Sequence, residues 1–348
     1  MSERPALPET VGDEAELEEL LSRPSERVVE TMARLEGDVI VLGVGGKMGP
    51  TLARMARRAS DAAGVSRRVI GVSRFSTPGL EARLGAHGVE TIRCDLLSRK
   101  QLGELPEVPN VVYMAGMKFG ATDQEPLTWA MNVYLPGMVC EKFHNSRIVA
   151  FSTGNVYGMV RAESGGSRES DPPRPDGDYA MSCLGRERIF AHFSETLGIP
   201  VAIVRLNYAN EPRYGVLVDV GQRVAAGEPV DLTMGYFNAI WQGDANAMIL
   251  SLFGHLESPP LVVNVTGAER LRVRDVAEQF GGLYEKPVEF RGGEAPDALL
   301  SNAERAFRLV GRPQVGPGQM IRWIGDWLRR GGPTLNKPTH FEVRDGKF

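Results

Sequence analysis

Short apolar runs alternate with longer amphipathic stretches from residue 38 onward. The runs span 38–43, 67–73, 89–93, 110–116, 147–152, 201–206 and 261–265 and are rich in Val and Ile. Runs of this length, apolar at almost every position, are typical of strands buried on both faces. Most are separated by helical patterns, such as the apolar stripe formed by Met48, Leu52, Met55, Ala56 and Ala59. Alternation sustained this long predicts an α/β fold with a doubly wound parallel sheet and right-handed crossovers.

The same pattern divides the chain into four parts. Residues 1–36 form an N-terminal helical extension, read as two short amphipathic helices that pack on the main body. Residues 37–207 and 236–265 carry the strand–helix alternation. Residues 208–235 and 266–330 form a smaller C-terminal lobe that covers one edge of the sheet and shapes a substrate pocket. Residues 331–348, with Gly, Pro and charge but little periodicity, form an irregular tail.

Composition narrows the classes of partner. Lys and Arg number 40 against 44 Asp and Glu, which offers no basic field for a nucleic acid. The 3 cysteines stand far apart and the 5 histidines show no ligand spacing, so we expect a reducing compartment, no disulfide and no metal. The acidic N-terminus does not read as a signal peptide, and no apolar run reaches membrane-spanning length. We therefore expect a cytoplasmic protein without a membrane or nucleic-acid partner.

A glycine-rich loop follows the first apolar run. It reads GVGGKMG and places Gly43, Gly46 and Gly49 at GxxGxxG spacing around Lys47 and Met48. Glycines there permit a tight turn, close approach of the backbone to a pyrophosphate and close packing of helix on strand, while the helix N-terminus supplies amide donors. The loop therefore predicts a dinucleotide-binding domain; the alternative is a glycine turn without a ligand.

The end of the second run bears on which dinucleotide binds. An acidic residue there would favour NAD by binding the ribose hydroxyls, but this chain has Ser73 and Arg74. A hydroxyl and a guanidinium suit a 2′-phosphate. We predict NADP as the preferred cofactor, with NAD as the alternative; otherwise Arg74 is a surface residue without a ligand.

Four further motifs follow in order: CDLLS (94–98), YMAGMKFGATDQEPLTWAMNVYLPGM (113–138), FSTGNVYG (151–158) and DYAMSC (178–183). With the glycine loop, they make the chain from about 38 to 330 resemble the extended short-chain dehydrogenase/reductase superfamily. The resemblance is to its NAD-dependent epimerase/dehydratase branch and extends to the UDP-galactose 4-epimerases. It implies a Rossmann-like fold with a smaller C-terminal substrate lobe.

The resemblance also implies roles for particular residues. Asp95 and Leu96 would flank the adenine, Ala115 and Gly116 would line the cofactor, Lys118 would reach its ribose or phosphates, and Asn132 would lie near the nicotinamide. Thr153 and Tyr179 would be catalytic, with Thr153, Asn155 and Asn207 binding substrate. Thr153 could instead cap the following loop, and Tyr179 could anchor the start of a helix.

The chain departs from the family at one chemically important position. The family's YxxxK motif carries a lysine one helical turn after the tyrosine, and this chain has Cys183 there. A cation near a phenol lowers its pKa by stabilising tyrosinate, which a neutral thiol cannot do. Lys118, or Arg186 two turns along the face of Tyr179, could supply a substitute charge. Cys183 itself reads as a small buried apolar residue rather than a nucleophile.

Two functions from different classes remain open. The first is an NAD(P)-dependent oxidoreductase or epimerase that transfers hydride to or from a secondary alcohol or ketone of a sugar, sugar nucleotide or related polyol. The second is a catalytically lapsed dinucleotide-binding sensor or scaffold. An enzyme of altered chemistry that keeps the cofactor mainly for structure is a weaker third.

The resemblance also implies a homodimer as one option, through helices at 124–145 and 178–197.

Overall fold

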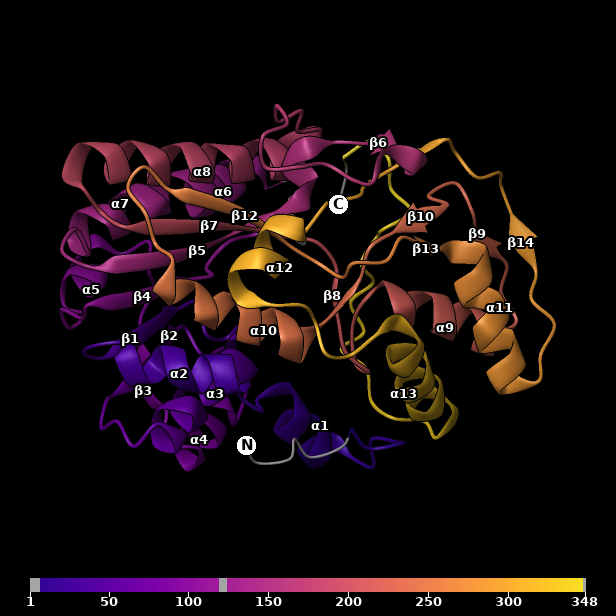
Figure 1. Ribbon diagram of the computed structural model, residues 1–348, viewed down its shortest axis with the longest axis horizontal. Coiled ribbons are helices and arrows are strands. Elements are labelled where there is room, and N and C mark those ends of the chain that lie inside the picture. Colours follow the sequence, from indigo (N-terminus) through magenta and orange to yellow (C-terminus); the bar gives the residue numbers. More distant parts are fainter. Residues whose placement is uncertain (1–6, 119–123, 347–348) are drawn as a thin grey trace.

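The computed structural model describes residues 7–118 and 124–346. Its centre is a parallel sheet of 7 strands in the order β12-β7-β5-β4-β1-β2-β3 (Figure 1). The strands are β1 (Val39–Leu42), β2 (Val69–Ser73), β3 (Glu90–Arg93), β4 (Asn110–Tyr113), β5 (Arg147–Thr153), β7 (Val201–Leu206) and β12 (Leu261–Val265). The predicted doubly wound parallel sheet is confirmed, and each of the apolar runs contributes a strand.

The strands form because their alternate side chains are buried on opposite faces. Val39 and Val41 of β1 join one core cluster, which includes Leu52 of α3. Ile40 and Leu42 join the cluster on the other face. A strand with both faces covered must be apolar throughout, which explains the unbroken Val and Ile runs.

Helices cover both faces of the sheet (Figure 1). One layer contains α2 (Glu26–Arg34), α3 (Gly49–Ala62), α4 (Leu80–Ala86), α10 (Gln242–Ser251) and α12 (Glu304–Val310). The other contains α5 (Arg99–Gly103), α7 (Leu135–Lys142) and α8 (Gly177–Leu197). α6 (Glu125–Trp129) runs into α7 through one turn of π-helix, η1 (Ala130–Tyr134), and packs beside α8.

The order of the strands reverses at β1, which lies between β2 and β4. Ligands of open α/β sheets bind outside the carboxyl ends of the strands at such a switch point. Here the ends of β1 and β4 approach closely, because a Cβ built on Gly43 would lie 2.7 Å from the backbone nitrogen of Ala115. Gly43 also has a φ of +90°, so the turn after β1 depends on glycine at this position.

A second lobe lies beside the carboxyl edge of the sheet (Figure 1). Its core is formed by α9 (Val216–Ala226), α11 (Val273–Tyr284) and α13 (Pro317–Arg329). Short strands complete it and connect it to the sheet domain: β6 (Val160–Arg161) pairs with β15 (Asp297–Ala298), β8 (Ala209–Asn210) with β11 (Ile240–Trp241), β9 (Val230–Asp231) with β14 (Phe290–Arg291), and β10 (Tyr236–Phe237) with β13 (Leu271–Arg272). Three short 3₁₀ turns, η2 (Gly154–Tyr157), η3 (Ala162–Ser164) and η4 (Leu252–Gly254), also occur.

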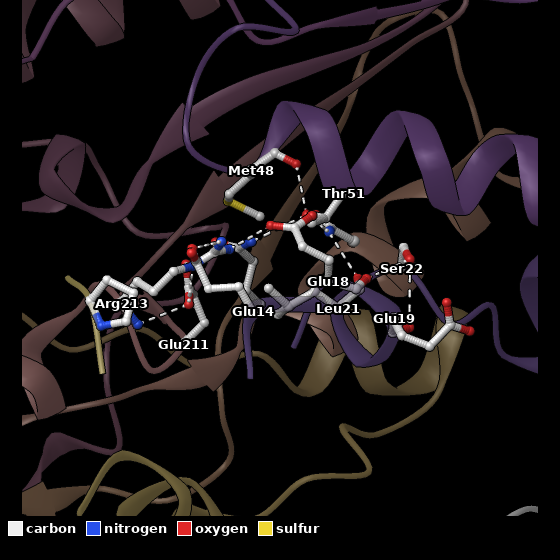
Figure 2. Close-up of polar contacts among 12 residues, drawn as sticks. Glu14, Glu18, Glu19, Leu21, Ser22, Met48, Thr51, Glu211 and Arg213 are labelled. Atoms are coloured by element: carbon white, nitrogen blue, oxygen red, sulfur yellow. Dashed lines mark hydrogen bonds and ion pairs between the residues drawn. The ribbon is translucent and has the colours of Figure 1, made fainter. Parts of the chain in front are cut away.

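The N-terminal helix α1 (Glu14–Leu21) joins this lobe to α3. Its leucines lie in the core of the lobe, and Glu19 forms ion pairs with Arg54 and Arg58 of α3. Figure 2 shows a second polar cluster, in which Arg213 contacts Glu18 at 2.8 Å and Glu211 at 3.0 Å. α1 therefore holds the loop at 211–213 against the sheet domain.

The tail after α13 is irregular and crosses the lobe toward α8. Thr339 donates its backbone N–H to Asp219 at 2.8 Å, and Phe341 is buried beside Phe237. Further on, a Cβ built on Gly177 would lie 2.3 Å from the carbonyl oxygen of Gly346. The tail thus reaches the first residue of the helix that carries Tyr179.

Candidate functional site

The glycine loop has the geometry of a phosphate cradle. A Cβ on Gly49 would lie 2.3 Å from the carbonyl oxygen of Val44, so α3 packs on the turn only with glycine there. A Cβ on Gly46 would meet only the carbonyl oxygen of Gly43, at 3.5 Å, so the backbone at Gly46 is open on that side. α3 begins directly after this turn, with Pro50 in its first turn, and the first N–H groups of a helix have no partner within the helix. These residues fit the pyrophosphate of a dinucleotide.

The residues predicted for the adenine end lie at the carboxyl ends of β2 and β3. The Ser73 hydroxyl accepts the backbone N–H of Phe75 at 2.9 Å, and the side chain of Arg74 is exposed. Asp95 is exposed and accepts the backbone N–H of Leu97 at 3.1 Å, while Leu96 is buried. All four residues lie at the same edge of the sheet. Among the described residues, no carboxylate forms an ion pair with Arg74.

The segment after β4 is fixed from the helix beside it. Asn132, in the π-helical turn, accepts the backbone N–H of Met117 at 2.9 Å and donates to its carbonyl oxygen at 3.0 Å. The Asn132 side chain also donates to the Ser182 hydroxyl of α8 at 2.9 Å. Asn132 therefore holds Ala115 and Gly116 in place through the backbone of the next residue.

Thr153 ends β5 and lies beside Tyr179, in the first turn of α8. The Tyr179 hydroxyl lies within hydrogen-bonding reach of the Thr153 hydroxyl and of the Cys183 sulfur, and it can donate its single proton to one of them at a time. Thr153 donates to the side chain of Asn155 at 2.9 Å, which places that amide next to the same group. The structure thus brings these four side chains together at the carboxyl edge of the sheet.

The electrostatics around Tyr179 are mixed. Burial, and next the Cys183 sulfur, raise the pKa of Tyr179 well above its ordinary value; Arg186 and the hydrogen bond with Thr153 oppose them. Burial likewise raises the pKa of Cys183, which is completely buried against Val156 and Tyr157. The phenol is therefore protonated over the ordinary pH range, and Cys183 packs as a small apolar residue.

Both candidate cations lie near this phenol. The Lys118 nitrogen lies 5.6 Å from the centre of the Tyr179 ring, and burial lowers the pKa of Lys118 to about 8. Arg186 is 6% exposed; its guanidinium donates to the carbonyl oxygen of Phe151 at 2.9 Å and to Asn132 at 2.5 Å. Lys47 of the glycine loop lies further along the crevice, where burial and the charge of Lys118 lower its pKa to about 6.

A small cavity adjoins the site on the side of the second lobe. It measures about 140 Å³ and is lined by residues of the segment between β5 and α8, Asn155 among them, and by residues of the lobe and tail, Arg344 among them. Asn207 is buried nearby, packed against Gly154, and donates to the carbonyl oxygen of Leu299 at 3.4 Å. Asn207 thus lies beside the Thr153 segment with its amide directed to the lobe.

Sequence reasoning missed two parts of this site. Tyr214 lies with its ring centre 3.3 Å from the Lys47 nitrogen, although the two residues are far apart in the chain. Under the site, Glu187 accepts from Ser152 at 2.6 Å and pairs with Arg205 at 2.7 Å, both ion-pair partners being buried. In the sequence, the signal for this ion pair is that Glu187 follows Tyr179 by eight residues, which places its carboxylate on the buried face of α8, where it needs a cation.

Within the described ranges, no group of three or more His, Cys, Asp or Glu side chains could hold a metal ion. No helix in those ranges is long and apolar enough to cross a membrane.

The fold and the glycine loop define the class of Rossmann-like α/β proteins with a second lobe over the carboxyl edge of the sheet. The family model described as NAD dependent epimerase/dehydratase family matches residues 39–217, and the chain belongs to this family. The predicted family resemblance is thereby confirmed.

Known relatives agree with this assignment. A GDP-6-deoxy-D-mannose reductase from Pseudomonas aeruginosa is 25% identical over 301 residues, covering 75% of this chain and 97% of its own. Two solved structures share the fold. A UDP-glucuronic acid 4-epimerase from Bacillus cereus, in complex with UDP-glucuronic acid and NAD, aligns with a TM-score of 0.69 at 18% identity, over 84% of this chain and 99% of that chain. A dTDP-glucose 4,6-dehydratase from Streptomyces venezuelae, with NAD bound, gives 0.71 at 19% identity, over 84% and 97%.

Proposed function

We propose that this protein is an NAD(P)-dependent enzyme that transfers hydride to or from a secondary alcohol or ketone of a sugar, sugar nucleotide or related polyol. The observation that supports it most directly is the close approach of the Thr153 and Tyr179 side chains at the carboxyl edge of the sheet. Family membership and the nucleotide-sugar relatives favour the same chemistry.

The chain's own groups have distinct tasks in this reaction. The glycine loop and the segment 115–118 hold the dinucleotide, which supplies or accepts the hydride when bound. Thr153 hydrogen-bonds the substrate oxygen and stabilises charge that develops on it. Tyr179 donates its proton to that oxygen as the carbonyl is reduced, and takes it back in the reverse direction.

The second lobe is proposed to select the substrate. The cavity of about 140 Å³ adjoins Asn155 and is walled by the lobe and the tail. Asn155, which lines the cavity, is proposed to orient hydroxyl groups there, and Asn207 is proposed to support the neighbouring Thr153 segment. Net reduction, and transient oxidation followed by return of hydride to the opposite face, use the same Tyr179 and Thr153.

We further propose that NADP binds in preference to NAD. The exposed Arg74 side chain at the end of β2 supports this, with the Ser73 hydroxyl beside it. A guanidinium can bind two oxygens of a 2′-phosphate.

A homodimer through α6, α7 and α8 is part of the same proposal. Large apolar side chains are exposed on these helices and the π-helical turn between them: Leu127 (42%), Trp129 (37%), Tyr134 (49%) and Met181 (48%). Light scattering on the purified protein tests this; a monomer at micromolar concentration contradicts it.

The function is tested by incubating the purified protein and either reduced cofactor with 4-keto and parent sugar nucleotides and with free sugars. The reduced-nicotinamide absorbance reports net redox, and chromatography of the sugars reports epimerisation. Tyr179→Phe is expected to lower the rate about 10²-fold to 10⁴-fold, since it removes the proton donor. The control is Tyr284→Phe, at the end of α11 in the second lobe, where the hydroxyl has no hydrogen-bond partner among the described residues. Turnover that is unchanged by Tyr179→Phe contradicts the assigned roles.

The second candidate is a dinucleotide-binding sensor without catalysis. Cys183 favours it, because its sulfur and the burial of the phenol raise the pKa of Tyr179 and make the phenol a weak proton donor. Tight cofactor binding with no reduction, oxidation or isomerisation of any sugar in the panel would support this candidate.

A further inference from the structure

Arg186 is a buried cation with only neutral hydrogen-bond partners. Its terminal nitrogens donate to a backbone carbonyl and to an amide, and its Nε is buried without a partner. The adjacent Glu187 is engaged by Arg205 at 2.7 Å. Among the residues that the structure describes, no carboxylate forms an ion pair with Arg186.

Such an arrangement is costly. An ion removed from water loses its hydration, and hydrogen bonds to neutral partners recover only part of that free energy. A hydrophobic residue would fill the same space without that penalty. The buried guanidinium of Arg186 therefore indicates a neighbouring group that becomes negatively charged during the reaction or on ligand binding.

The guanidinium lies at the reacting edge of the sheet. A Cβ built on Gly116 would be 2.3 Å from its Nη2 atom, so the cation touches the backbone just after β4. Arg186 is seven residues after Tyr179 on α8, and the charge of each group affects the pKa of the other. Cys183 lies between them on the same face of the helix.

We propose that Arg186 is the positioning cation of this site: it stabilises negative charge on the Tyr179 oxygen from two helical turns away, while holding the segment 115–117 through Asn132. The inference rests on the proposed function for its chemistry. In reduction, the carbonyl carbon of the substrate receives the hydride that the nicotinamide would supply, and the C=O π electrons pass to oxygen. The O–H bond of Tyr179 then breaks, a new O–H bond forms on that oxygen, and tyrosinate remains until it is reprotonated. Arg186 is cationic at every working pH, so its stabilisation of tyrosinate does not titrate.

A double-mutant cycle tests whether positions 183 and 186 share one charge site. We expect Cys183→Lys to be poorly tolerated beside Arg186, since two buried cations would then lie one turn apart. In the Arg186→Met background the same change is expected to be better tolerated. The coupling should be on the order of tenfold in the unfolding equilibrium constant, measured by urea denaturation. Additive effects at the two positions overturn the proposal.

A second measurement addresses the phenol directly and needs no substrate. Difluorotyrosine is placed at position 179, where fluorine lowers the phenol pKa into an accessible range, and its ionisation is followed by fluorine NMR. Arg186→Met is expected to reduce the tyrosinate fraction at a given pH by at least about tenfold. Arg186→Lys should largely preserve it, and Cys183→Lys should restore it in the Arg186→Met protein.

Two comparison variants separate this role from its alternatives. Arg67→Met removes another buried arginine, one that donates to the carbonyl of Met32 at 2.7 Å, and should lower stability without moving the titration. Lys118→Met removes the other nearby cation. If Lys118→Met shifts the titration and Arg186→Met does not, Lys118 is the positioning cation and the proposal is wrong. If positions 183 and 186 are coupled and the titration of residue 179 shifts as expected, but no sugar is turned over, the proposed function is rejected and the role of Arg186 stands.

Discussion

The side-chain nitrogen of Lys47 lies 3.3 Å from the centre of the Tyr214 ring, in the crevice above the glycine loop. The aromatic face partly compensates a cation that is otherwise poorly solvated. Even so, burial and then the charges of Lys118 and Lys337 lower the pKa of Lys47 to about 6. The loop therefore presents a largely neutral amine at neutral pH when no anion is bound.

This predicts that dinucleotide affinity depends on pH. A bound pyrophosphate favours the ammonium form and raises the pKa of Lys47, so binding takes up a proton above pH 6. Affinity should be highest below pH 6 and fall by up to about tenfold per unit as the pH rises toward the bound pKa. Calorimetric titration across pH measures it. Lys47→Met should remove the dependence and the exposed Lys100→Met should keep it; a flat profile in the unaltered protein contradicts the assignment.

Two glycines of the loop should respond differently to alanine. Gly49→Ala places a Cβ 2.3 Å from the carbonyl oxygen of Val44, so we expect a loss of about 2–3 kcal/mol of unfolding free energy. Gly46→Ala meets only an oxygen at 3.5 Å and should alter stability by less than about 0.5 kcal/mol. It should nevertheless weaken dinucleotide binding more than about tenfold, since its methyl group occupies the phosphate space. Equal stability losses in the two variants would show that the loop is not the cradle described.

Arg74 should determine the cofactor preference. Arg74→Ala is expected to weaken NADP binding by about tenfold or more and to leave NAD binding nearly unchanged, because a bidentate contact to the 2′-phosphate is lost. Dissociation constants for both cofactors, measured by quenching of tryptophan fluorescence, provide the test. Arg83→Ala, at an exposed arginine of α4, is the matched control. Tighter binding of NAD that is insensitive to Arg74→Ala would end this proposal.

Arg213 should be important for stability, whereas its exposed partner Glu14 should contribute little. Glu211 is 2% exposed and contacts Arg213 at 3.0 Å, so Arg213→Met leaves a buried carboxylate without its cation. We expect a loss of about 3–5 kcal/mol at neutral pH. Burial already raises the pKa of Glu211 against the effect of Arg213, so the loss should shrink in acid as Glu211 takes up a proton. Glu14→Gln, at an exposed partner 3.3 Å away, should cost less than about 1 kcal/mol in the same urea titrations.

Asp244 should make the fold less stable at neutral than at mildly acidic pH. Burial raises the pKa of Asp244 to about 6, although its carboxylate accepts two backbone N–H groups, at 2.9 Å and 2.8 Å. A raised pKa means that the folded state binds the proton more tightly, so this contribution is lost as the pH rises through 6. Asp244→Asn is expected to stabilise the protein by on the order of 2 kcal/mol at pH above 7 and to have little effect below the ordinary Asp range. A pH-independent difference would contradict the assignment.

The sheet was predictable because its evidence is local. Each strand is buried on both faces, as with Val41 and Leu42 of β1, so its sequence is apolar without interruption. The turn after β1 was equally readable, since Gly43 and Gly49 stand where a Cβ would strike backbone. Both signals are contained in a few consecutive residues.

The surroundings of Tyr179 were only partly predictable, since they depend on separate segments. Spacing placed Arg186 on the face of Tyr179, but its partner Asn132 comes from a π-helical turn that no sequence periodicity marks. The ring of Tyr214 over Lys47 likewise requires the second lobe to be in place. Such contacts follow from packing of the two parts of the chain.

The approach of Gly346 to Gly177 has a practical consequence. Because Gly177 begins the helical turn that presents the phenol, a bulky group attached at Gly346 would press on that turn. Loss of activity in protein altered at that residue would then report on this contact rather than on the chemistry of Tyr179.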